Sequence, residues 1–82
     1  MFDVFYKTLD STDIANFFVS LNGTPIDTTN VALDLIGGTA QYLSASGDFG
    51  VDGTKVIWDN TSFALHYVMD IGDRIRVIYD RS

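Results

Sequence analysis

The sequence predicts an all-β fold, a small antiparallel β-sandwich or open barrel of about six to seven short strands. The first observation behind this prediction is an Asp-Gly pair at positions 52 and 53 between short apolar runs, which is typical of a β-hairpin over residues 48–58. The second is the alternation of apolar and charged residues over 74–79, which is typical of a half-buried strand. The third is that all eleven acidic residues are Asp, which disfavours long surface helices.

The N-terminal part of the chain predicts two strands joined by a structured connector. Residues 2–7 alternate as a strand does, and residues 11–16 hold several N-cap residues that suit a single helical turn. Residues 17–21 have the β-branched and aromatic content of a second strand. The Asn22-Gly23 pair then predicts a hairpin turn, with a return segment over 24–27 that Pro25 confines to an edge or a loop.

The middle of the chain predicts a strand over 31–36 and a second extended piece over 39–43. Gly37-Gly38 separates them, and either a hairpin or one bent strand fits this pattern. Residues 44–47 are expected to form a small flexible loop.

Beyond that loop, the turn of the 48–58 hairpin is expected to be type I′, centred on Asp52-Gly53. Within the hairpin, alternation makes Trp58 a core residue beside Val56. Residues 60–71 fit either an extended or irregular segment or a short helix, and the first is favoured.

Composition restricts the class of protein. A chain of 82 residues is one domain, spanning 1–82, and buries only about 60% of the surface that its unfolded form exposes. There is no cysteine and one histidine, so neither disulfides nor thiolate metal sites are available. Association with further copies of the chain is therefore the expected way to stabilise so small a core.

The net charge and the hydropathy of the chain restrict which partners are expected. The net charge of −6 repels a phosphate backbone, so nucleic acid is not an expected partner. No apolar stretch approaches the roughly 20 residues of a membrane span, and the N-terminus lacks a signal-peptide pattern. Neither a membrane nor a cofactor is expected.

Three motifs resemble chemical sites, and each has a simpler interpretation. Asp48-Phe49-Gly50 matches a kinase metal motif without the rest of a kinase. An EF-hand-like loop is matched at four positions, by Asp48, Asp52, Gly53 and Asp59. A strand is expected in the second half of this loop, so the acidic turns are expected to be exposed. Calcium binding is left as a question for experiment. His66 lies four residues after Ser62 without a third group to orient it, so no catalytic residue is predicted.

Aromatic residues are numerous for such a small core, with six Phe, four Tyr and one Trp. Alternation places Phe5 on the face opposite Phe2 and Tyr6, and Phe18 opposite its neighbours, so some aromatic side chains are expected to be exposed. Exposed aromatic surface marks a protein contact in many proteins. The candidate interface residues are Phe2, Phe5, Tyr6, Phe18, Tyr67, Arg74 and Arg76.

Several segments together resemble a known family. They are Thr12–Ala15, Val19–Leu21, Val31–Asp34, Gly37–Gln41, Asp48–Val51, Val56–Trp58 and Gly72–Tyr79. In this order and spacing they resemble the small β-sandwich modules of tailed-bacteriophage virion proteins. The resemblance implies a non-enzymatic structural protein of the virion, assembled in the cytoplasm of the host bacterium.

Within that family, the expected role is a capsid decoration (cement) protein. It would form a homo-oligomer, with a trimer favoured, and bind a major capsid or tail protein. A tail, neck or fibre component is the alternative, and a carbohydrate-binding module for host attachment is the second alternative.

Overall fold

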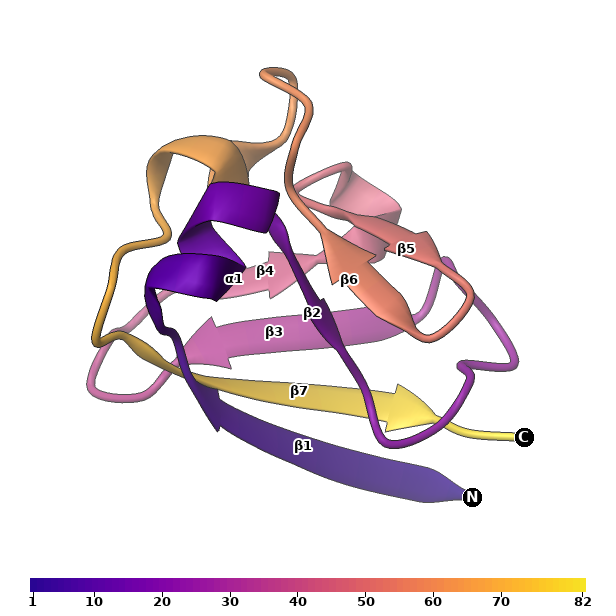
Figure 1. Cartoon of the computed structure of the whole chain (residues 1–82). Coiled ribbons are helices and arrows are strands. Elements are labelled where there is room, and N and C mark those ends of the chain that lie inside the picture. The colour runs from indigo at the N-terminus through magenta and orange to yellow at the C-terminus, as the bar shows by residue number, and fades with distance from the viewer.

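Two antiparallel sheets packed face to face form the protein (Figure 1), so the all-β prediction is confirmed. The structure is a computed structural model that describes residues 1–82. The four-stranded sheet has the order β1 (Phe2–Thr8), β7 (Arg74–Asp80), β3 (Val31–Leu35) and β4 (Gln41–Leu43). The three-stranded sheet has the order β2 (Phe18–Ser20), β6 (Lys55–Ile57) and β5 (Gly50–Asp52). Three short helices connect strands: α1 (Ser11–Asn16), η1 (Ser44–Ser46) and η2 (Ala64–Tyr67).

A single cluster of thirteen buried apolar residues lies between the sheets. From β7 it contains Ile75, Val77 and Tyr79, each fully buried, as the alternation over 74–79 predicts. From the opposite sheet it contains Val56, with Trp58 directly after β6, so the prediction that Trp58 is a core residue beside Val56 is confirmed. The core therefore forms where the period-two rows of the two sheets face each other.

Strands β1 and β7 pair along their whole length and bring the ends of the chain together. Their register runs from Phe2 opposite Asp80 to Thr8 opposite Arg74. Because β7 buries its odd-numbered residues, the odd-numbered residues of β1 lie on the same inner face. This register makes Phe5, opposite Val77, the buried residue of β1.

The Tyr79 hydroxyl joins three separate parts of the chain. It accepts a hydrogen bond from the Gly23 N–H at 2.9 Å and donates one to the Asp3 carboxylate at 3.1 Å. Arg81 approaches the same carboxylate at 3.3 Å. Burial raises the pKa of Tyr79, so the hydroxyl keeps its proton and its donor role.

Helix α1 is a single turn held by a reciprocal cap. The Asp10 carboxylate accepts from the Asp13 N–H at 2.9 Å, and the Asp13 carboxylate accepts from the Asp10 N–H at 3.0 Å. The hydrogen bond from the Asp13 N–H lowers the pKa of Asp10. Phe17 ends the helix in the left-handed region at φ +61° and redirects the chain into β2.

The predicted hairpin at Asn22-Gly23 is wrong. Strand β2 pairs with β6, and the chain after β2 instead crosses to the end of the four-stranded sheet. There Pro25 forms a bridge with Arg81, and the Ile26 N–H donates to the Asp80 carbonyl at 2.9 Å. Val19 pairs with Val56 of β6, and both side chains are buried in the core, whereas Pro25 and Ile26 contact the end of the four-stranded sheet.

The other two turns are hairpins, and one differs in type from the prediction. Gly37-Gly38 separates β3 from β4 as a hairpin, not as a bend in one strand, and the Gly38 N–H donates to the Leu35 carbonyl at 2.9 Å. The β5–β6 hairpin is confirmed, but its central residues are Gly53 and Thr54 because Asp52 pairs with Lys55. Only Gly53 has positive φ, which is the type II′ pattern and not type I′.

Two connections contain more regular structure than the sequence predicts. Residues 44–46 form the 3-10 helix η1 where a flexible loop is expected. Within 60–71, the segment is irregular except for the 3-10 helix η2, whose Leu65 is fully buried. Leu65 is buried whereas Tyr67, two residues later, is 73% exposed, so the side chains do not follow the period of two that a strand has.

We expect Tyr79→Phe to lower the free energy of unfolding by about 1–3 kcal/mol, because the part-buried Gly23 N–H loses its acceptor. Urea denaturation followed by Trp58 fluorescence measures this change. Tyr67→Phe is the matched control, since Tyr67 is 73% exposed and makes no hydrogen bond through its hydroxyl. Equal stability of the two variants would contradict a structural role for the Tyr79 hydroxyl.

Candidate functional site

The outer face of the four-stranded sheet carries a row of apolar side chains, of which Val4 and Leu43 are exposed and Ala32 and Ile78 are half-buried. Val4 is opposite Ile78, Ile78 is opposite Ala32, and Ala32 is opposite Leu43, so the four side chains form one line across all four strands. Each of them alternates with inward-facing residues of its own strand. The row is therefore a product of strand order and register.

Two aromatic residues of β1 extend this row along the edge of the sheet. Phe2 is 69% exposed and Tyr6 is 50% exposed, on the same face as Val4. We call these residues the outer apolar patch: Phe2, Val4, Tyr6, Ala32, Leu43 and Ile78. An uncovered sheet face with this composition is typical of a contact surface.

Two arginines lie beside the outer apolar patch and differ in their contacts within the chain. The Arg76 Nε donates to the Asp34 carboxylate at 3.2 Å, and this hydrogen bond raises the pKa of Arg76. The Arg74 guanidinium lies 5.4 Å from the centre of the Tyr6 ring. The charge of Arg76 is therefore compensated by Asp34, whereas Arg74 has no carboxylate partner and borders the patch as an exposed positive charge over the Tyr6 ring.

The seven candidate interface residues separate into distinct places. Phe2, Tyr6, Arg74 and Arg76 share the outer face of the four-stranded sheet. Phe5 is 9% exposed and belongs to the core, so the expectation that it offers contact surface is wrong. The reason is its pairing opposite the buried Val77, which turns its side chain inward.

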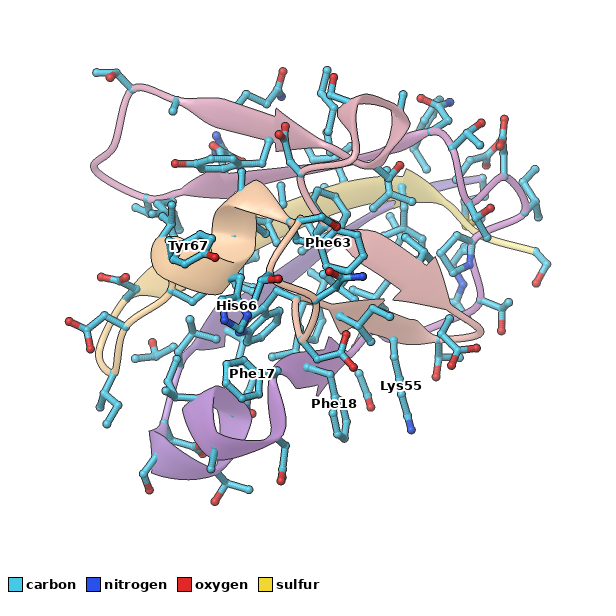
Figure 2. All side chains as sticks on the ribbon, turned by 90° about the horizontal axis from the view of Figure 1, so that it is seen from above. Phe17, Phe18, Lys55, Phe63, His66 and Tyr67 are labelled. Atoms are coloured by element: carbon cyan, nitrogen blue, oxygen red, sulfur yellow. The ribbon has the colours of Figure 1, made fainter.

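Phe18 and Tyr67 lie on the other side of the molecule (Figure 2). The ammonium of Lys55 is 4.6 Å from the centre of the half-buried Phe18 ring, on the outer face of the three-stranded sheet. Phe63 covers Gly50 on the same face, since a Cβ at Gly50 would lie 3.0 Å from the Phe63 ring. That face is therefore partly closed by side chains of the monomer.

The only histidine is part of a short aromatic stack. The rings of Phe17 and His66 are nearly parallel with centroids 5.1 Å apart, and Tyr67 meets His66 edge-on at 5.0 Å (Figure 2). The Nδ1 atom of His66 lies 2.9 Å from the Trp58 carbonyl oxygen, which can only accept, so Nδ1 carries a hydrogen there. His66 thus ties η2 to the end of β6.

A groove of about 340 Å³ lies where β1, β2 and α1 meet. Its base is apolar, from Phe5 and Val19, and Lys7 forms an ion pair with Asp13 at 3.3 Å on its wall. It follows the open side of the sandwich, where the edge strands of the two sheets lie on either side.

Of the three Asp residues in the EF-hand-like window, Asp48 makes a hydrogen bond within the chain. The Asp48 carboxylate accepts from the Leu43 N–H at 3.0 Å. No group of three or more His, Asp or Glu side chains is arranged to hold a metal ion, and no helix is long and apolar enough to cross a membrane.

The chain matches no protein-family model, no curated protein and no solved structure.

We expect Phe5→Ala and Phe2→Ser to act differently on the monomer. Removing the buried Phe5 ring should lower the free energy of unfolding by about 3 kcal/mol, because it leaves a cavity. The exposed Phe2 makes no core contact, so its replacement should change that free energy by no more than about 0.5 kcal/mol. Denaturant unfolding of dilute protein measures both, and a larger loss for Phe2→Ser would contradict the assignment of the two faces.

Proposed function

We propose that this chain is a non-enzymatic structural protein of a tailed-bacteriophage virion, most directly a small capsid decoration protein. The outer apolar patch carries this proposal, because it gathers exposed aromatic and aliphatic side chains on one face of the β-sandwich, outside the core. Through it, the protein binds a larger capsid subunit and adds contact area to the particle. A stable contact of this kind buries about 1,200–2,000 Å² in total, and many copies on a lattice multiply its effect.

The composition of the patch supports a protein as the occupant. Protein interfaces are enriched in aromatic residues and have few charges at their centre. Phe2 and Tyr6 supply aromatic rings, Val4 and Leu43 supply aliphatic contacts, and the nearby Arg76 is already neutralised by Asp34. The resemblance of the sequence to virion β-sandwich modules supports the choice of a phage particle as the setting.

The role of His66 supports a non-enzymatic assignment. Its Nδ1 donates to the Trp58 carbonyl and its ring is stacked on Phe17, so the contacts of His66 connect two parts of the fold. A tail, neck or fibre component would use the same surface. The particle experiment below distinguishes these locations.

A carbohydrate-binding module is the second candidate, and one observation favours it. The Tyr67 ring is 73% exposed beside the Phe17 and His66 stack, and exposed aromatic rings can stack on sugars. A glycan array tests this candidate. Binding that Tyr67→Ala abolishes would favour it over the decoration role.

We expect the chain to be present on purified particles and to sit on their heads. Particles from an induced or infected culture of the source bacterium are purified on a density gradient, the chain is identified by mass spectrometry, and immunogold labelling locates it. Label on the head supports decoration, and label on the tail moves the assignment to the alternative. Particles that lack the chain would overturn the virion proposal.

A matched pair of variants tests the patch itself. Val4→Asp places a charge in the patch and should reduce the copies per particle at least tenfold. Ile71→Asp adds the same charge at a residue that is 60% exposed and outside the patch, so its occupancy should equal that of the wild type. Equal loss for both variants would mean that the patch is not the contact.

A further inference from the structure

The outer edge of β1 is a long, unpaired strand edge. In its pairing with β7 the bonded positions alternate, with the Arg81 N–H donating to the Met1 carbonyl and the Leu9 N–H to the Asp73 carbonyl, each at 2.8 Å. Odd-numbered residues therefore face β7. The N–H and C=O groups of the even-numbered residues point away from the sheet, where Figure 1 shows no other strand.

This edge differs from the other three edges of the sandwich. Strands β2, β4 and β5 are three residues long, whereas β1 has seven. Natural proteins shorten or charge their free edges to prevent pairing with other chains. On β1 the outward side chains Phe2, Val4 and Tyr6 are apolar or aromatic, and only the Val4 N–H is capped, by the Asp3 carboxylate at 2.9 Å.

We propose that the partner of this edge is a second copy of the chain, with the two β1 strands pairing antiparallel about a two-fold axis at Phe5. In this register, the numbers of two residues that lie opposite each other add up to ten. Asp3 lies opposite Lys7 of the second copy, and Val4 lies opposite Tyr6 of the second copy. Because Val4 and Tyr6 are even-numbered, the backbone groups that meet are those that point away from β7. On pairing, the Val4 N–H exchanges the Asp3 carboxylate for the Tyr6 carbonyl of the second copy.

Charge selects this register among those that the backbone allows. If the two-fold axis lies at residue 4 or at residue 6 instead of residue 5, even-numbered residues still lie opposite even-numbered residues. One shift sets Asp3 opposite Phe5 of the second copy, and the other sets Lys7 opposite Phe5 of the second copy. Only the register centred on Phe5 places opposite charges directly across from each other, whereas the shifted registers set a charge against an aromatic ring. Within one copy Asp3 contacts Arg81 and Lys7 contacts Asp13, so the pair between copies adds to these contacts.

The pairing also joins the two outer apolar patches. In one copy Phe2, Val4 and Tyr6 lie along the edge on the outer face. Across the two-fold axis the same three side chains continue on the same face of an eight-stranded sheet. Exposed apolar surface on the edge strand is thus partly covered by the second copy, while the rest of each patch stays open to another partner.

This inference goes beyond the proposed function, because it names a partner and a register that do not depend on a virion. It replaces the expected trimer by a dimer, since a contact in which the same edge meets itself closes at two copies. Absence of the chain from phage particles would overturn the proposed function and leave the dimer intact. A monomer in solution would overturn the dimer and leave docking on a particle intact.

The native mass of the wild type, measured by light scattering over a concentration series, should rise to that of a dimer. Lys7→Asp gives a chain with two acidic positions on the edge, and Asp3→Lys gives a chain with two basic positions. Each variant alone should remain monomeric, and an equimolar mixture should form a heterodimer. A wild type that stays monomeric throughout, or a dimer that both variants form alone, would overturn the proposal.

Cysteine cross-linking tests the register without changing its charges and covers the case in which a charge variant fails to fold. The chain has no cysteine, so no native thiol can form a competing disulfide in the single-cysteine variants. A mixture of Val4→Cys and Tyr6→Cys chains should form a disulfide between copies on mild oxidation, because opposite residues in a bonded pair lie within the range a disulfide spans. A mixture of Val4→Cys and Thr8→Cys is the control and should cross-link at least tenfold more slowly. Equal rates for the two mixtures would overturn the register.

Discussion

The antiparallel pairing of β1 with β7 is the constraint on which the rest of the structure depends. It joins the two ends of the chain into one sheet, and its register assigns the odd-numbered residues of β1 to the core face. The same register brings Asp3 beside Tyr79, whose hydroxyl holds the crossing segment at Gly23. It also leaves Phe2, Val4 and Tyr6 outside, so a single pairing decides both what is buried and what is available for contact.

Local patterns were sufficient for much of the fold. The alternation in β7, the β5–β6 hairpin and the burial of Trp58 follow from period and turn chemistry. The partner of β2 did not follow, because its pairing with β6 joins residues far apart in the chain. The sequence also did not determine which face of β1 is buried. The more apolar face of a strand is usually the buried one, but in β1 the face with three apolar residues is exposed and the face with Phe5 is buried. Only the register with β7 determines this orientation.

The same limit applies to the candidate surface. Exposure of Phe2 and Tyr6 could be anticipated from the excess of aromatic residues. The excess of aromatic residues does not reveal Ala32, Leu43 and Ile78 as part of the surface. These three residues become neighbours only through the strand order β1-β7-β3-β4. The single hint in the sequence is Ile78, an apolar residue at a position where the strand otherwise places Arg74 and Arg76.

The outer side of β1 is an unpaired edge and, in the proposed dimer, the centre of assembly. Hydrogen exchange at individual amides of β1, followed by NMR at low and high protein concentration, tests this claim most directly. The amides of Phe5 and Lys7, bonded to β7, should be protected at every concentration, and those of Tyr6 and Thr8 should become protected only in concentrated protein. Tyr6 and Thr8 amides that exchange equally fast at all concentrations would contradict it.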